Sequence, residues 1–438
     1  MNRITQKPRN VLVAWFSFFQ ILLFQTTLCL AEEPVSITGT TMGPIVFEVT
    51  VVSPPDGFSK DSLEPEINAA LERVNSLMST YIATSDVSRF NESDSIEWFE
   101  VEQETASVVA RSIEISELTG GAFDITVSPA VALWDFGSGA GEVELPTDDE
   151  ITAVKSITGF ELIEARLEPP AIKKQNSNVQ IDLSAIAKGY AVDAVAEVLT
   201  SAGCENYLVV VGGEVFAAGN SPKGEAWRLG IEKPVVDRRE PDSIASLNGQ
   251  AMATSGDYRN FHMIDGRAYS HTIDPSTCRP VDHALASATV IANDCMTADA
   301  LATAAMVLGE ERAGAVCDEV DAHWLFITRK DPDPRVEAGF ERTSSDGFPE
   351  VQLTSNESGG SDSILPVFFA AAIVFGLAIL GMAVGSIFAN KPVQGSCGGL
   401  SAMAGESECG ICSKPVTDCV EQQSETTVQD DADQEAGG

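Results

Sequence analysis

Residues 252–283 read MATSGDYRNFHMIDGRAYSHTIDPSTCRPVDH, and this run holds three of the chain's four histidines. Its ionisable side chains lie among hydroxyls and turn-forming glycines: His262, His271, His283, Asp257, Asp265 and Asp274. A segment built only for burial would show apolar alternation, which this one lacks. The composition favours a folded site that handles protons, phosphate or metal.

On both sides of this run, helical and strand patterns are mixed without strict alternation. Apolar spacing predicts helices over 64–80, 105–118, 190–202 and 297–308, and strands over 45–52 and 207–211. The segment 331–346 loses periodicity. The mixture predicts an α+β fold for the domain that covers residues 32–350.

The chain is strongly acidic. It has 438 residues, of which 44% are hydrophobic, and 27 Lys+Arg against 65 Asp+Glu give a formal net charge of −38. Nucleic-acid binding needs a basic stripe, and because the sequence has none we exclude nucleic acid as a partner. An anionic ligand would have to be met locally, by a cation or by helix amino termini.

The amino-terminal segment has the pattern of an export signal. Basic residues precede the apolar run Val11–Phe24, and Cys29-Leu-Ala31 follows it. We therefore predict a signal peptide over residues 1–31, which exports the domain that follows. An uncleaved anchor helix is the alternative, and it would export the same domain.

A second apolar run, Ile364–Ala389, has no charge in its interior. As a helix it would extend about 39 Å, enough to cross a bilayer core of about 30 Å. We predict a transmembrane helix over 364–389, joined to the domain by a polar linker at 351–363; a buried helix of a soluble domain is the alternative. Acidic residues precede the run and Lys391 follows it, which favours a cytoplasmic tail over 390–438.

The cysteines of the domain and the tail form two groups. In the domain, one or two disulfides could join Cys204, Cys278, Cys295 and Cys317. The tail holds a cluster made of Cys397, Cys409, Cys412 and Cys419. The spacing in the tail fits a soft-metal or iron–sulfur site and leaves iron and zinc open. A disordered tail with incidental thiols is the alternative.

Two loops in the domain combine conformational freedom with charge. The glycines of Gly120–Pro129 permit close backbone approach, and Asp124 could accept hydrogen bonds from a ligand; an ordinary helix–strand connection would look the same. The segment from Asp182 precedes a helix expected to start near Tyr190. Its free amides, with Lys188 beside Asp182, could bind an anion; a surface ion pair with a helix cap is the alternative.

Asp299 and Thr303 are four residues apart on a predicted helix, so they share one face. A carboxylate with a hydroxyl suits a hard cation such as Mg²⁺, which keeps other ligand positions for water or phosphate. The alternative is a solvated Asp with a Thr that faces the core.

These segments and several other short motifs occur in one order along the chain: Gly39–Gly43, Met78–Tyr81, Ser88–Asn91, Gly121–Asp124, Asp182–Asp193, Val211–Gly213, Thr254–Tyr258, Ser270–Pro275 and Ala298–Thr303. In this order they resemble the FAD:protein FMN transferase family (ApbE). The resemblance implies an exported domain of mixed sheets with flanking helices. It also implies Mg²⁺-dependent transfer of FMN from FAD to a Thr or Ser hydroxyl of a target protein, with release of AMP.

The resemblance implies roles for individual residues. The family's FAD contacts match Met42, Tyr81, Ala122, Phe123, Asp124, Asp182, Lys188 and Ile273. Its Mg²⁺ site matches the main-chain carbonyl of Ala185, with Asp299 and Thr303. His271 matches the histidine that activates the acceptor hydroxyl, and an unperturbed imidazole has a pKa of about 6.5.

The sequence departs from the family pattern at two of these motifs. Pro44 stands where Thr usually follows Met-Gly, which puts a phosphate contact in doubt. Cys278 stands where Gly is usual, which could alter a turn. Both departures favour an alternative function, a non-catalytic FAD-binding protein. A further alternative is an assembly scaffold that delivers metal through its cysteine tail.

The tail is similar to NqrM, a small membrane protein that assists maturation of the Na⁺-pumping NADH:quinone reductase. The similar segment is Lys391–Leu400, directly after the apolar run and before the tail cysteines. It implies a chain anchored in a bacterial inner membrane, with the catalytic domain in the periplasm and the tail in the cytoplasm. The implied partner is a flavin-accepting subunit of a membrane redox complex.

Overall fold

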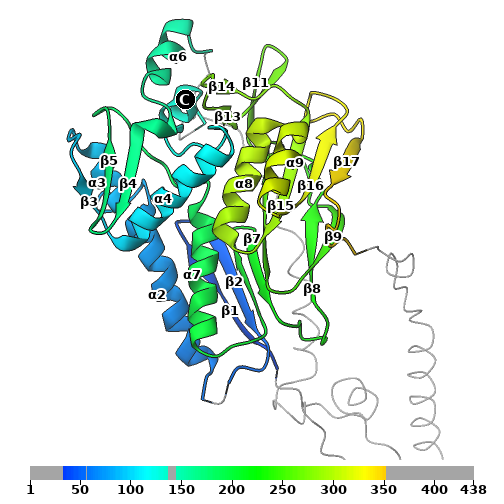
Figure 1. Ribbon diagram of the computed structural model, residues 1–438. Helices are drawn as coiled ribbons and strands as arrows, with labels where there is room; N and C mark the ends of the chain where they lie inside the picture. Colours follow the sequence, from blue (N-terminus) through cyan, green and yellow to red (C-terminus); the bar gives the residue numbers. More distant parts are fainter. Residues whose placement is uncertain (1–32, 56, 137–144, 352–438) are drawn as a thin grey trace, which may run out of the picture. The chain divides into compact units, whose positions relative to one another are not determined.

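The computed structural model describes residues 33–55, 57–136 and 145–351 (Figure 1). The predicted signal peptide, membrane helix and cysteine tail lie outside these ranges, as does nearly all of the predicted linker. Among the described residues, no helix combines the length and the apolar character needed to cross a bilayer.

An eight-stranded sheet forms the centre of the domain, and every neighbouring pair in it is antiparallel. Its order is β1 (Val35–Thr41), β2 (Ile45–Val51), β6 (Tyr207–Val211), β7 (Glu214–Ala218), β10 (Gln250–Gly256), β15 (Leu285–Ala292), β16 (His323–Arg329) and β17 (Phe340–Ser344). The α+β prediction is confirmed. The expectation of mixed sheets is wrong, because the strands of the central sheet lie side by side in chain order and every neighbouring pair is antiparallel. Strand β17 lies in the segment expected to lack periodicity, since its exposed edge position needs no apolar alternation.

Four small antiparallel sheets and the helices surround this sheet. The small sheets are β3 (Phe99–Glu100), β5 (Pro170–Lys174) and β4 (Ile163–Leu167); β8 (Trp227–Glu232) and β9 (Pro241–Leu247); β11 (Phe261–Ile264) and β12 (Arg267–Ser270); and β13 (Ile273–Asp274) and β14 (Arg279–Pro280). The helices are α2 (Lys60–Met78), α3 (Asp86–Glu92), α4 (Gln103–Leu118), α5 (Ser128–Leu133), α6 (Asp148–Lys155), α7 (Ala187–Ser201), α8 (Cys295–Leu308) and α9 (Glu310–Glu319), with a short 3₁₀ turn, η1 (Phe160–Leu162).

Helices α2, α7 and α8 pack on one face of the central sheet (Figure 1). The buried face of α2 repeats at helical spacing through Leu63, Ile67, Leu71 and Val74, as its sequence predicts. Helix α8 is buried on nearly all sides and is rich in alanine, because it packs against β10 and β15 of the sheet and also against α7 and α9. The small side chains of α8 let the two helices approach closely, and this contact positions the charged residues of the site.

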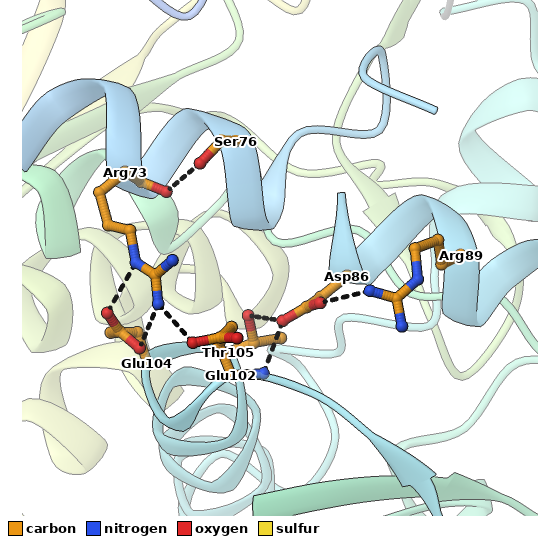
Figure 2. A network of polar contacts seen from close by, with 7 residues as sticks. All are labelled: Arg73, Ser76, Asp86, Arg89, Glu102, Glu104 and Thr105. Atoms are coloured by element: carbon orange, nitrogen blue, oxygen red, sulfur yellow. Dashed lines mark hydrogen bonds and ion pairs between the residues drawn. The ribbon is translucent and has the colours of Figure 1, made fainter. Parts of the chain in front are cut away.

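A polar network joins α2 and α3 to the start of α4 (Figure 2). Asp86 is buried, and its carboxylate accepts hydrogen bonds from the Glu102 amide at 2.8 Å and the Thr105 hydroxyl at 3.0 Å. Arg73 of α2 pairs with Glu102 and Glu104. The Arg73 pairs are half exposed and contribute little stability, so the buried Asp86 carboxylate is the main polar link between α3 and the start of α4.

The four cysteines of the described domain are free and buried, so the expectation of disulfides among them is wrong. They lie in different parts of the core: Cys204 follows α7, Cys278 lies between β13 and β14, Cys295 begins α8, and Cys317 is in α9. Each thiol therefore packs as a small apolar group.

Candidate active site

A cavity of about 470 Å³ lies where the ends of β10 and β12 meet helices α7 and α8. Ten of the residues proposed from the sequence line this one cavity: Ala122, Phe123, Asp124, Asp182, Ala185, Lys188, His271, Ile273, Asp299 and Thr303. They come from segments more than a hundred residues apart, so the fold gathers the proposed site residues into one place.

The remaining two, Met42 and Tyr81, line an adjoining and mostly apolar cavity of about 600 Å³. The two cavities share Asp182, Ser184 and Lys188. The ring of Tyr81 is 92% exposed, so one of its faces is free to stack on a planar ligand. The pair of cavities can therefore hold an elongated ligand with a planar group at one end.

Lys188 lies in the first turn of α7, because this helix begins at Ala187 and not near Tyr190. Its ammonium group does not pair with Asp182, so the alternative of a surface ion pair with that residue is wrong. It contacts Asp299 at 3.1 Å and Glu214 at 3.1 Å instead. Burial lowers the pKa of Lys188, but the two carboxylates outweigh burial and leave the pKa above its usual value.

Asp299 is buried, with 2% of its surface exposed, so the alternative of a solvated Asp is wrong. Its Oδ2 atom accepts a hydrogen bond from the Gly189 amide at 3.0 Å. Burial raises the pKa of this carboxyl, and Lys188 opposes the rise. One turn later, the Thr303 hydroxyl lies 3.3 Å from the Ser255 hydroxyl. The carboxylate and the alcohol thus face the same cavity as the Ala185 backbone.

Glu214 is a charged residue of this cavity that sequence reasoning missed. It is the first residue of β7 and only 5% exposed. Burial raises its pKa to about 7, although the charge of Lys188 lowers it. The sequence did indicate that Glu214 directly follows the Val211-Gly-Gly213 motif. It could not indicate that Glu214 pairs with a residue of α7, because that contact depends on how the helix packs on the sheet.

His271 follows β12, and a backbone carbonyl fixes its tautomer. Its Nδ1 atom lies 3.0 Å from the carbonyl oxygen of Asn260. Because a carbonyl can only accept, Nδ1 carries the proton and the neutral ring keeps a lone pair on Nε2. Burial lowers the pKa of His271, and the Asn260 hydrogen bond and the charge of Asp257 oppose this shift. The expectation of an unperturbed pKa is therefore wrong.

The other two histidines of the run, His262 and His283, do not line this cavity. His262 stacks on Phe136 with ring centroids 4.3 Å apart. His283 lines a separate cavity, where Asp257 forms a buried ion pair with Arg329 of β16. Within the described chain, the idea of one site for all three histidines is wrong, because His262 lies on β11, His271 follows β12 and His283 lies between β14 and β15.

The two departures from the family pattern have different structural consequences. Cys278 has a φ of 51°, in the left-handed region that glycine adopts most readily. The Trp134 indole donates to its carbonyl at 2.8 Å, which holds that conformation. Pro44 lies exposed at the mouth of the apolar cavity.

The contact between α7 and α8 requires a glycine at position 189, and this gives a first prediction. A Cβ atom on Gly189 would lie 2.3 Å from the carbonyl oxygen of Cys295. We expect Gly189→Ala to destabilise the domain by about 1–3 kcal/mol through overpacking, measured by urea unfolding. The matched control is Gly230→Ala in β8, where nothing lies within 4 Å of the added atom. Equal effects of the two substitutions would contradict this packing account.

Known proteins share this arrangement of segments. The family model described as the ApbE family matches residues 42–326, which contain most of the central sheet and the lining residues of both cavities. The chain belongs to the ApbE family. A second model, described as (Na⁺)-NQR maturation NqrM, matches residues 386–430, beyond the described residues.

Relatives of known activity support the assignment to the ApbE family. The chain is 43% identical to the FAD:protein FMN transferase of Vibrio cholerae over 316 residues, which are 72% of this chain and 92% of the relative. It is 36% identical to that of Haemophilus influenzae over 324 residues, 73% and 92% of the two chains.

Solved structures of ApbE proteins share the fold. The flavin transferase ApbE from Vibrio cholerae matches with a TM-score of 0.65 and 42% identity, over 73% of this chain and 99% of that one. The apo form of the flavinyl transferase ApbE from Pseudomonas stutzeri matches with a TM-score of 0.64 and 36% identity, over 72% and 95%.

Proposed function

We propose that this chain is an FAD:protein FMN transferase, which moves FMN from FAD to a Thr or Ser hydroxyl of a target protein and releases AMP. The observation that carries the proposal is the gathering of the family's ligand-binding and proton-accepting residues around one cavity. The ApbE relatives named above, all flavin transferases, support it.

The shape of the two cavities suits FAD. The apolar cavity beside Met42 and Tyr81 can take a ring system of the dinucleotide. The diphosphate can then lie in the polar cavity, near Lys188 and the amino terminus of α7, where an ammonium group and the positive end of the helix dipole favour an anion. This placement leaves His271 beside the transferred phosphoryl group.

The cavity also fits a divalent cation, for which the oxygen donors would be Asp299, Thr303 and the Ala185 carbonyl. In the described residues no three His, Cys, Asp or Glu side chains form a metal cluster by themselves. One carboxylate with a hydroxyl and a carbonyl oxygen suits Mg²⁺, which takes one or two carboxylates and completes its ligands with water and substrate phosphates. When bound, the cation neutralises charge on the phosphoryl oxygens and the leaving AMP.

His271 supplies the base. Its Nε2 lone pair can accept the proton of the acceptor hydroxyl while the oxygen attacks the FMN-side phosphorus. The bond to AMP breaks, and the product is a phosphoester between the flavin and the target. The Asn260 carbonyl keeps the ring in the tautomer that this step needs.

The lowered pKa of His271 predicts the pH dependence of transfer. Because burial disfavours the imidazolium form, the base stays neutral to a lower pH than a free imidazole with a pKa of about 6.5. We expect the acid limb of kcat/KM at saturating Mg²⁺ to have its midpoint below that value and to disappear in His271→Gln. An acid limb that persists in His271→Gln would assign the titration to another group.

We further propose that the domain acts in the periplasm of a bacterium, tethered to the inner membrane by residues 364–389, with the cysteine tail in the cytoplasm holding iron or zinc. The apolar runs of the sequence and the NqrM match at 386–430 support this arrangement. The target would then be a flavin-accepting subunit of the Na⁺-pumping NADH:quinone reductase or a related membrane complex. Cysteine accessibility to a membrane-impermeant thiol reagent in intact and opened cells tests the sidedness.

The proposal is tested by incubating the purified chain with FAD, Mg²⁺ and an acceptor subunit. We expect flavin fluorescence on the acceptor after denaturing electrophoresis, and none when the accepting hydroxyl is removed by Thr→Val or Ser→Ala. A chain that binds FAD but labels no acceptor would favour the non-catalytic alternative. Deleting residues 392–438 separates the scaffold alternative, because the enzyme alone should still label the acceptor.

A further inference from the structure

The ammonium group of Lys188 bridges two buried carboxylates in the proposed FAD cavity. Its Nζ atom lies 3.1 Å from Oε1 of Glu214 and 3.1 Å from Oδ1 of Asp299. Glu214 is 5% exposed and Asp299 is 2% exposed. The two carboxylates come from β7 and α8, so the fold brings two distant segments to a single ammonium group.

The side chains that line this cavity carry more negative than positive charge. Asp124, Asp182, Glu214 and Asp299 line the cavity, and Lys188 is the one lysine or arginine among its lining residues in the described chain. The Oε2 atom of Glu214 is buried and has no hydrogen-bond partner. A buried carboxylate oxygen without a partner is costly, and the cavity must in addition accept a diphosphate.

The lack of a side chain at Gly212 leaves room for one cation to replace another here. A Cβ atom at this position would lie 3.3 Å from Oε2 of Glu214 and 3.3 Å from Cδ of Lys188. Lysine carries its charge on a flexible four-carbon stem, so its ammonium group can swing away without movement of α7. Mg²⁺ prefers one or two carboxylates together with substrate phosphates, and the pair Glu214 and Asp299 meets that preference.

We propose that Glu214 is a further ligand of the divalent cation, which binds between Glu214 and Asp299 in place of the Lys188 ammonium, and that the displaced ammonium then meets the FAD diphosphate. The inference rests on the proposed function and adds a residue to its cation site. It explains why a cavity for an anionic ligand contains a buried glutamate: the glutamate helps to hold the cation that the ligand needs.

The test measures cation binding directly, with Mn²⁺ and the full-length chain in the absence of FAD. Mn²⁺ is followed by the electron paramagnetic resonance of the free ion, and it prefers oxygen ligands to the thiols of the tail. We expect Glu214→Gln to weaken Mn²⁺ binding roughly 10- to 100-fold. FAD binding in EDTA should not weaken, since the substitution removes a negative charge near the diphosphate. Glu214→Asp should recover part of the Mn²⁺ affinity.

The matched control is Asp124→Asn, a carboxylate of the same cavity whose Oδ1 bonds Thr126. It should leave the Mn²⁺ affinity close to that of the wild type. A second measurement does not depend on any variant: Mg²⁺ should speed acetylation of Lys188 in the wild-type chain, followed by peptide mass spectrometry, because the displaced amine becomes accessible. Unchanged Mn²⁺ affinity in Glu214→Gln, or Mg²⁺-independent acetylation, overturns the inference and leaves the transferase function standing. A wild-type chain that binds no Mn²⁺ overturns the cation role in the proposed function as well.

Discussion

Replacing Asp299 with alanine is expected to reduce FMN transfer by about three orders of magnitude or more. The substitution removes the buried carboxylate that pairs with Lys188 and that we assign to the cation. Charge stabilisation by a catalytic metal is worth several kcal/mol, and each 1.36 kcal/mol corresponds to a tenfold change in rate. The measurement is the initial rate of covalent flavin formation on the acceptor at saturating FAD and Mg²⁺.

The Asp299 experiment needs a control for folding, because the residue is buried. Asp299→Asn keeps the shape of the side chain and removes its charge, and we expect it to lose transfer as severely as the alanine variant. Urea unfolding of both variants shows whether the domain remains folded. Full activity of either variant in excess Mg²⁺ would remove Asp299 from the cation site.

Replacing His271 with alanine is expected to slow transfer by about 10²–10⁴-fold, the usual contribution of a general base. FAD affinity should remain nearly intact, because the diphosphate contacts that we propose come from Lys188, the amino terminus of α7 and the cation, and not from His271. Stopped-flow or single-turnover measurement of acceptor labelling gives the rate, and fluorescence titration gives the FAD affinity.

His262→Ala is the matched control for His271→Ala. His262 lies on β11 of the hairpin that directly precedes His271, stacks on Phe136 and does not line the FAD cavity. It should therefore retain most of the transfer activity. Equal losses in the two variants would indicate that the hairpin, and not the His271 base, is what the reaction requires, and unchanged turnover in His271→Ala would exclude it as the base.

The sequence predicted those parts of the fold and site that depend on local patterns. Helix α2 and strand β6 follow from apolar spacing, and the left-handed glycines after α4 follow from a Gly-Gly pair at its end. The order of short motifs was enough to propose twelve residues of the domain that the structure places around two adjoining cavities.

The features that the sequence could not supply depend on contacts between distant segments. Lys188 pairs with Glu214 and Asp299, which only the packing of α7 against β7 and α8 reveals. The tautomer of His271 depends on a backbone carbonyl eleven residues away. The sequence left disulfides possible, because the spacing of cysteines along the chain carries no information on the distance between their thiols in the core.

The most direct test of the central claim is the intact mass of an acceptor subunit after reaction with the purified chain, Mg²⁺ and FAD labelled in its flavin half. The account predicts that the acceptor gains one labelled FMN through a phosphoester, and that AMP appears in equal amount. An acceptor that gains the mass of AMP or of whole FAD, or that stays unmodified while FAD is bound, would contradict it.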